Sequence, residues 1–212
     1  RLAELGYRKA DLVVRPGVSG RFRPPAESEV ISMRERLGLG GQYLLALSTL
    51  EPRKNLASLV EAYLAMRRAG ELEGVALVLA GQAGWKNTAL EAKVEEARAA
   101  GAEIRLTGRV PEALLPALYA GAEAVVMPSI YEGFGLPVLE ARLCGARVVA
   151  TDIPEIREAG GSQAIYVPPD VAGIQAGIRR ALMGPRPDAV EGCLDFPRWE
   201  IEGRKLAKVL AD

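Results

Sequence analysis

The sequence contains no histidine among its 212 residues. A Ser-His-Asp triad, a zinc ion with histidine ligands and a histidine general base are therefore excluded within this chain. Only two cysteines are present, Cys144 and Cys193, which are too few for a disulfide framework and favour a reduced, cytoplasmic setting. The sequence also has no Asp-x-Asp pair, a motif that would hold a metal ion.

The chain likewise lacks net charge and long apolar runs. Lys and Arg together number 27, as do Asp and Glu, so the formal charge is +0 and the basic face that nucleic-acid binding requires is not indicated. No apolar run approaches the roughly 18 residues that span a bilayer, and no signal peptide is recognisable. Because the chain begins at Arg1, without a methionine and inside a helical pattern, we expect it to be a fragment of a longer protein.

Apolar strands alternate with helical patterns along most of the sequence. At 49% hydrophobic and 25% charged residues, the chain fits one domain or one large half of a two-domain enzyme. Uninterrupted apolar strands between helices predict an α/β fold, a doubly wound, Rossmann-like parallel sheet of about six strands covered on both faces. Asn55 is expected to cap a helix, and Pro116 to kink or restart one. Strands are expected at residues 11–14, 43–47, 75–80, 103–106, 124–127, 147–150 and 164–167, and helices at residues 1–10, 29–38, 55–70, 88–100, 111–118, 137–145, 153–159, 171–183 and 199–210.

Residues 128–145, PSIYEGFGLPVLEARLCG, form a strand–turn–helix pattern around which the other motifs are arranged. Gly133 and Gly135 allow a sharp turn after the strand, and Pro137 suits the first helical position. Such a turn presents free backbone N–H groups and the positive end of the helix dipole, which suits phosphate. Glu132 before the turn and Glu140 in the first helical turn remain for neutral groups such as sugar or ribose hydroxyls, so we interpret the stretch as a nucleotide-sugar site.

Simpler interpretations stay open for these residues. Gly-rich turns occur in any parallel α/β protein, so this one can also be interpreted as no more than a tight turn. Considered without its neighbours, Glu132 would be interpreted as a solvated loop carboxylate. Glu140 would be interpreted as a surface carboxylate that the helix dipole stabilises. The dinucleotide fingerprint G-x-G-x-x-G fails at Val138, which weakens the alternative of a NAD-dependent oxidoreductase. Arg53 and Lys54, just before a helix start, form either a solvated basic loop or a pair of cations that neutralise a diphosphate.

Two separate motifs resemble one enzyme family. The seven residues between Glu132 and Glu140 make this stretch similar to the E-x7-E signature of retaining GT-B-fold glycosyltransferases of family 4. Cys144-Gly145 and the apolar residues 148–151 continue the pattern, and residues 48–56, STLEPRKNL, resemble the basic phosphate loop of that family. The likeness runs from about Val14 to the C-terminus, which identifies the chain as resembling the C-terminal, donor-binding domain.

The resemblance implies a role for each residue that matches the motifs. Arg53 and Lys54 would contact the donor phosphates and stabilise the departing nucleoside diphosphate, which explains why the family needs no metal ion. Glu140 would bind the ribose hydroxyls, and Glu132 would contact the donor sugar near the reacting carbon. A change at Glu132 would then affect only the intact nucleotide sugar, whereas a change at Glu140 would affect the nucleotide itself. Backbone groups of Gly133, Phe134, Gly135 and Leu136 would meet sugar and phosphate, and those of Arg109 and Val110 would meet the base.

The resemblance also implies a division of the chain. Residues 1–24 would end the N-terminal domain or form the interdomain connection, residues 25–195 would bind the donor, and residues 196–212 would form a crossover helix. In the connection Ser19 stands where the family usually has Asp. The acceptor, a sugar or a lipid-linked sugar, would bind through an N-terminal domain missing from this chain.

The implied reaction is a metal-independent, retaining hexosyl transfer from a nucleoside-diphosphate sugar, in bacterial polysaccharide or glycolipid assembly. The form of residues 51–55 resembles enzymes of polysaccharide assembly, which suggests GDP-mannose as the donor, and no further cofactor is expected. The parent protein would be cytoplasmic, with peripheral association at the inner face of the membrane. The alternative is a stand-alone nucleotide-binding or regulatory module without catalysis.

Overall fold

The computed structural model describes residues 14–84, 88–187 and 199–211. The described residues do not include the expected helix at residues 1–10 or the first three residues of the expected strand at 11–14. They also do not include Trp85 and Cys193. The chain divides into two compact units, of which the larger spans residues 21–191 and the smaller combines residues 1–20 with 192–212.

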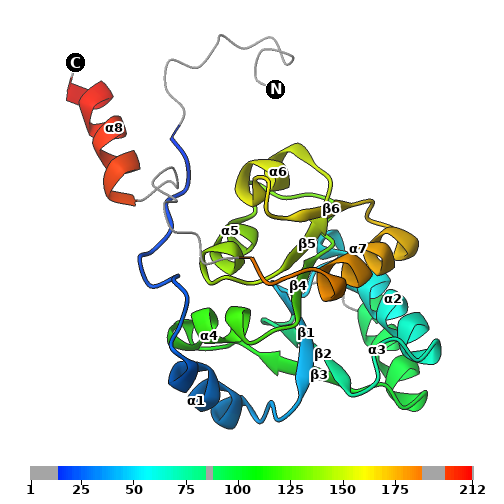
Figure 1. The fold of residues 1–212 in the computed structure, drawn as a ribbon. Helices are drawn as coiled ribbons and strands as arrows, with labels where there is room; N and C mark the ends of the chain where they lie inside the picture. Colours follow the sequence, from blue (N-terminus) through cyan, green and yellow to red (C-terminus); the bar gives the residue numbers. More distant parts are fainter. Residues whose placement is uncertain (1–13, 85–87, 188–198, 212) are drawn as a thin grey trace, which may run out of the picture. The chain divides into compact units, whose positions relative to one another are not determined.

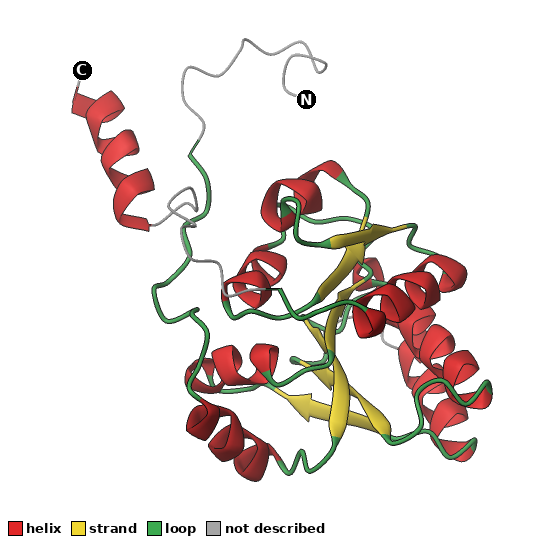
Figure 2. Ribbon diagram, in the orientation of Figure 1, coloured by secondary structure: helices red, strands yellow, loops and turns green. Residues whose placement is uncertain are grey.

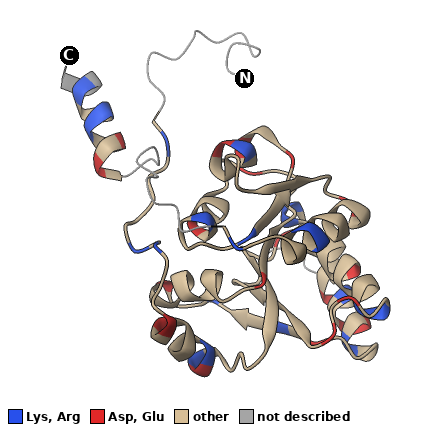
Figure 3. Ribbon diagram, viewed as in Figure 1, with Lys and Arg blue, Asp and Glu red and all other residues tan. Residues whose placement is uncertain are grey.

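A parallel sheet of six strands forms the centre of the larger unit, in the order β3-β2-β1-β4-β5-β6 (Figure 1). Every pair of neighbouring strands is parallel, as the apolar runs predicted. Arg105 is the one charged residue within these six strands, and Figure 3 shows that the charges of this unit lie mainly on its helices and loops. The strands are β1 (Gln42–Leu47), β2 (Val75–Ala80), β3 (Ile104–Gly108), β4 (Ala124–Met127), β5 (Val148–Thr151) and β6 (Ile165–Val167).

Helices cover both faces of this sheet (Figures 1 and 2). On one face α2 packs against α3 and α7, and on the other face α4 packs against α1 and α5, which contacts α6. A cluster of buried apolar side chains lies under α2, α3 and α7 and includes the fully buried Leu59, Tyr63 and Ile178. The helices are α1 (Glu27–Leu37), α2 (Leu56–Arg68), α3 (Thr88–Ala99), α4 (Leu115–Ala120), α5 (Leu136–Leu143), α6 (Pro154–Gly160) and α7 (Val171–Met183), with short 3-10 turns η1 (Pro52–Lys54) and η2 (Glu112–Leu114).

Three helix ends involve Pro116, Asn55 and Cys144. Pro116 restarts a helix, because η2 ends at Leu114 and α4 begins at Leu115. Asn55 stands at the N-cap position of α2, as expected, but with φ 55° and ψ 32° its side chain makes no cap hydrogen bond. In this left-handed conformation the Nδ2 of Asn55 instead donates to the Pro169 carbonyl at 2.6 Å. Cys144 is buried at the C-cap position of α5.

Gly81 brings the loops that follow β1, β2 and β3 into contact. The Ser48 N–H donates to the Ala80 carbonyl, and the Gly81 N–H to the Gly108 carbonyl, each at 2.9 Å. Gly81 has φ 140°, and a Cβ atom there would lie 1.8 Å from the Ser48 carbonyl oxygen. Only glycine allows this approach, so Gly81 sets the spacing of the loops at the carboxyl edge of the sheet.

The smaller unit contains the expected terminal helix, α8 (Trp199–Ala211). Glu202 on this helix is buried and accepts hydrogen bonds from the Arg15 backbone N–H at 3.0 Å and from Lys205 Nζ at 2.6 Å. A Cβ atom on Gly17 would lie 2.3 Å from the Trp199 nitrogen, so the segment before residue 20 lies against the start of α8. Among the described helices of both units, none has the length and apolar character that crossing a membrane requires.

Replacing Gly81 with Ala tests the close approach of the loops. The added methyl group would overlap the Ser48 carbonyl, so Gly81→Ala should lower the free energy of unfolding by about 1–3 kcal/mol. Gly40→Ala is the matched control, because a Cβ atom there meets nothing within 4 Å. Urea denaturation of both variants measures the difference, and equal stability of the two would contradict the analysis.

Candidate functional site

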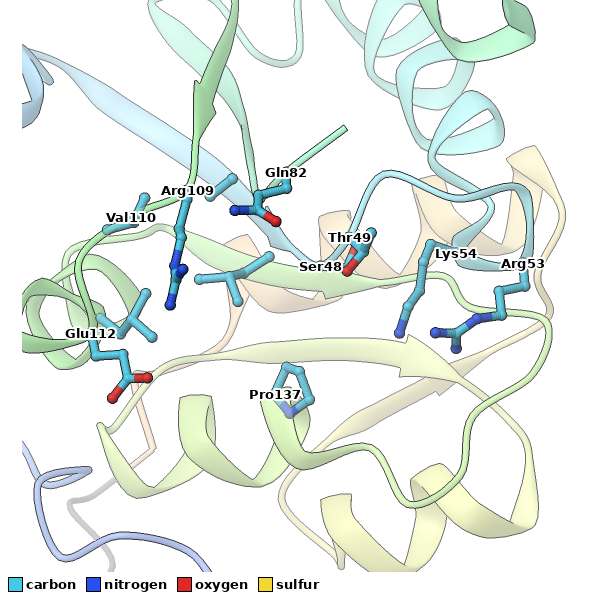
Figure 4. Close-up of a pocket in the computed structure, with 13 residues that line it drawn as sticks. Ser48, Thr49, Arg53, Lys54, Gln82, Arg109, Val110, Glu112 and Pro137 are labelled. Atoms are coloured by element: carbon cyan, nitrogen blue, oxygen red, sulfur yellow. The ribbon is translucent and has the colours of Figure 1, made fainter. Parts of the chain in front are cut away.

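A cavity of about 380 Å³ lies at the carboxyl ends of β1, β2 and β3 (Figure 4). Ligands of open parallel sheets bind at this edge, because the loops after the strands meet there. The volume falls within the range of roughly 300–1,000 Å³ that small-molecule sites occupy. Its polar or charged lining residues are Ser48, Thr49, Arg53, Lys54, Gln82, Arg109 and Glu112.

Arg53 and Lys54 reach the cavity from η1. The Lys54 N–H donates to the Glu51 carbonyl at 3.0 Å, and Pro52 stands in the first turn, so the backbone of the basic pair is held in a short helical turn. The Arg53 side chain is 41% exposed, whereas the Lys54 side chain is 8% exposed. The interpretation as a solvated basic loop therefore fails for Lys54.

Glu132 is the ion-pair partner of both cations. Its Oε1 accepts from Lys54 Nζ at 2.5 Å and from Ser129 Oγ at 2.7 Å, and its Oε2 accepts from Arg53 NH1 at 3.3 Å. Only 6% of Glu132 is exposed. The interpretation of Glu132 as a solvated loop carboxylate is therefore wrong, because its charge is balanced in a nearly dry environment.

Glu140 has a different environment. The expectation that it stands in the first turn is wrong: α5 begins at Leu136, so Glu140 is the fifth helical residue and the first turn has no acid. It is half-buried, its Oε2 accepts from the hydroxyl of the buried Tyr119 at 2.9 Å, and it does not belong to the cavity lining that the structure describes. Burial raises the pKa of the Glu140 carboxyl, the Tyr119 hydrogen bond lowers it, and Glu112 raises it.

The glycine turn leads into α5 without a side-chain cap. Gly135 has φ 87° at the N-cap position, and Pro137 from the first turn lines the cavity. One first-turn N–H is occupied within the turn, since Val138 donates to the Gly135 carbonyl at 2.9 Å. The four predicted backbone contributors, Gly133, Phe134, Gly135 and Leu136, do not belong to the described lining.

Arg109 and Val110 line the cavity directly after β3. Four further polar residues line the cavity: Ser48 and Thr49, which lie in the predicted phosphate loop but were assigned no role, and Gln82 and Glu112, which no motif indicated. Ser48 and Gln82 follow strand ends, and the rule that ligands bind at that edge is a signal that could have found them. Glu112 carries no such signal, and its carboxylate pairs with Arg21 at 2.6 Å.

Among residues 14–84, 88–187 and 199–211, no group of three His, Cys, Asp or Glu side chains is arranged to hold a metal ion. The charges that do meet at the cavity are those of arginine, lysine and glutamate. Cationic side chains that can contact an anionic group therefore line the cavity, with carboxylates beside them.

Residues 41–183 match the model of the family described as "Glycosyl transferases group 1". Over 161 residues the chain is 39% identical to O-antigen chain mannosyltransferase B of Escherichia coli. The aligned region covers 76% of this chain and 42% of that protein. It is 32% identical over 214 residues to the GDP-mannose-dependent alpha-(1-6)-phosphatidylinositol monomannoside mannosyltransferase of Mycolicibacterium smegmatis, covering 92% of this chain and 55% of that protein. The chain thus spans about half the length of the curated relatives it matches.

The fold has relatives among solved structures. HepE of Anabaena, solved in complex with UDP and glucose, superimposes with a TM-score of 0.80 at 20% identity, covering 94% of this chain and 56% of that one. The strand order and this likeness match one Rossmann-like half of a GT-B fold, as expected.

The raised pKa of Glu140 predicts a pH-dependent stability. A carboxyl whose folded pKa lies above its unfolded value binds more protons in the folded state, so the contribution of Glu140 to the stability falls as pH rises above about 4.3, the ordinary glutamate pKa. Glu140→Gln removes this loss of stability, because glutamine does not titrate. The free energy of unfolding of the variant minus that of the unmodified chain should therefore be larger at pH 7 than at pH 4. Tyr119→Phe, which removes the hydrogen bond that lowers this pKa, should show the opposite trend. Urea denaturation at both pH values measures the differences, and a pH-independent difference for Glu140→Gln would contradict the prediction.

Proposed function

Because the chain belongs to the group 1 glycosyl transferase family, whose model matches residues 41–183, we propose that it is the donor-binding domain of a retaining glycosyltransferase. The complete protein transfers a hexosyl group from a nucleoside-diphosphate sugar to an acceptor in polysaccharide or glycolipid assembly. The observation that carries the proposal is the cavity at the strand ends, with Arg53 and Lys54 in one part of its lining and Arg109 and Val110 in another (Figure 4).

The positions of the lining residues support an order for the parts of the donor. The diphosphate lies at Arg53 and Lys54, whose fork and point charge suit phosphate oxygens. The nucleoside extends toward Arg109 and Val110 after β3. The sugar lies near Glu132, which contacts both cations, and near backbone groups of residues 133–136. Glu140 binds the ribose hydroxyls. The two cations stabilise the diphosphate as the bond to the anomeric carbon breaks, so the reaction proceeds without a metal ion.

The donor that we propose is GDP-mannose. Both sequence relatives have mannosyltransferase in their names, and the mycobacterial protein is described as GDP-mannose-dependent. A thermal-shift panel of GDP, UDP and ADP, each with and without its sugar, tests this choice. Stabilisation by UDP or ADP but not by GDP would contradict it.

The proposal also includes the organisation of the complete protein. Since the chain covers 42% and 55% of two relatives, we propose that a second half binds the acceptor, a sugar or a lipid-linked sugar. Residues 1–24 connect the halves, residues 25–195 bind the donor and residues 196–212 form the crossover helix. A cytoplasmic location, with peripheral association at the inner face of the membrane, belongs to the same proposal.

Substitution of the basic pair tests the phosphate position. Arg53→Ala and Lys54→Ala should each weaken binding of GDP by roughly 1–3 kcal/mol, the contribution of a charge-assisted hydrogen bond. Lys93→Ala is the control, because Lys93 is a partly exposed lysine on α3 that does not line the cavity. Calorimetric titration of each folded variant gives the affinities. Unchanged affinity in both cavity variants would mean that the phosphates bind elsewhere.

The 212-residue chain should bind the donor without efficient transfer. Transfer requires the anomeric carbon and the acceptor hydroxyl to meet in a near-attack geometry, which contributes up to roughly 7–11 kcal/mol. A domain that holds only the donor leaves the sugar open to water, so slow, acceptor-independent hydrolysis of GDP-mannose is expected. Release of GDP is measured with and without a mixture of sugar acceptors. Rapid, acceptor-dependent release would show that this chain needs no second half.

A further inference from the structure

The two cations proposed for the phosphates already contact carboxylates. Lys54 Nζ lies 2.5 Å from Glu132 Oε1, and Arg53 contacts Glu132 Oε2 at 3.3 Å and Glu51 Oε2 at 2.9 Å. We call these four residues, Glu51, Arg53, Lys54 and Glu132, the charge cluster. Two positive and two negative side chains give it no formal net charge. A diphosphate that entered the cluster as it stands would therefore meet no excess positive charge.

Glu132 and Glu51 hold different positions in this cluster. Glu132 bridges both cations and is 6% exposed, whereas the Glu51 side chain is 18% exposed and contacts Arg53. Lys54 is also buried, and a buried ammonium that loses its anion is strongly destabilised. An anion must therefore stay beside Lys54, and the incoming phosphate is the group that can replace the Glu132 carboxylate there.

Ser129 holds the carboxylate in this arrangement. It is 1% exposed, and its Oγ lies 2.7 Å from the same Oε1 that accepts from Lys54. The loop that carries both residues is joined to the basic pair through its backbone, since the Ile130 N–H donates to the Arg53 carbonyl at 2.9 Å. Movement of the Glu132 side chain thus does not require the two loops to separate.

We propose that the Glu132 carboxylate occupies the place of a phosphate group when no donor is bound, and that the donor diphosphate displaces it from Lys54 and Arg53. Ser129 is a positioning residue that stabilises the unliganded arrangement. This inference rests on the proposed function, and it assigns to Glu132 an effect on phosphate binding in addition to its role toward the sugar. Displacement couples the two events, because the carboxylate becomes available to the sugar only when the phosphates have taken its cations.

The inference predicts an unusual direction of change. Glu132→Gln removes the competing charge, so the 212-residue chain should bind pyrophosphate and GDP about tenfold more tightly, the equivalent of one charge-assisted hydrogen bond. Ser129→Ala weakens the hold on the carboxylate and should tighten binding of both probes by about two- to threefold, a fraction of a neutral hydrogen bond. Glu96→Gln, at an exposed carboxylate of α3, is the control and should leave both affinities unchanged. A merely structural role of Glu132 or Ser129 predicts weaker binding instead.

Calorimetric titration with pyrophosphate and with GDP separates the inference from the proposed function. Unchanged or weaker pyrophosphate binding by Glu132→Gln overturns the inference. If that variant fails to fold, as judged by circular dichroism, Ser129→Ala takes its place. Unchanged or weaker pyrophosphate binding by Ser129→Ala then overturns the inference. Absence of GDP binding by the unmodified chain, together with tighter pyrophosphate binding by the variants, overturns the proposed function and supports the inference. Absence of pyrophosphate binding by every protein overturns the inference.

Discussion

The ion pair between Lys54 and Glu132 is the contact on which the rest of the site depends. It joins the loop after β1 to the loop after β4, which are 78 residues apart in the sequence. Both side chains are nearly excluded from water, so either charge that leaves the pair needs another partner in its place. The pair therefore sets the distance between the basic loop and the glycine turn. The Ser129 hydroxyl and the Arg53 guanidinium complete the hydrogen bonding of the same carboxylate.

The order of the strands explains why these two loops meet. The sheet runs β3-β2-β1 in one direction and β4-β5-β6 in the other, so the order reverses between β1 and β4. Loops that leave neighbouring strands at such a point turn to opposite faces of the sheet and leave a crevice between them. The lining of the cavity combines residues from both halves, with Arg53 and Arg109 from the first and Pro137 from the second. The position of the proposed donor site is thus a property of the topology as well as of the motifs.

The two glutamates of the E-x7-E stretch differ in their electrostatic environment. Glu132 is held as an anion between a lysine and an arginine, whereas Glu140 contacts the neutral hydroxyl of Tyr119. Burial raises the pKa of Glu140, so this carboxyl pays a desolvation cost that its neighbours offset only in part. A ligand hydroxyl that donates to Glu140 would reduce that cost, which agrees with the proposed contact to ribose. One glutamate of the motif thus pairs with two cations, whereas the other accepts a hydrogen bond from a neutral hydroxyl.

The amino-acid sequence by itself determined the parallel sheet, most of its helices, the cavity residues Arg53, Lys54, Arg109 and Val110, and the family. These features depend on local patterns: apolar runs make buried strands, and a motif keeps its residues in a fixed order along the chain. Only the tertiary structure decided that Glu132 pairs with Lys54, that Ser129 and Tyr119 hold the two glutamates, and that the Asn55 side chain contacts Pro169 instead of capping α2. Tyr119 and Ser129 have the sequence pattern of ordinary core and loop residues, because a hydrogen bond between distant residues has no local signature. Burial and partner choice depend on which strands become neighbours, and that is settled when the whole sheet packs.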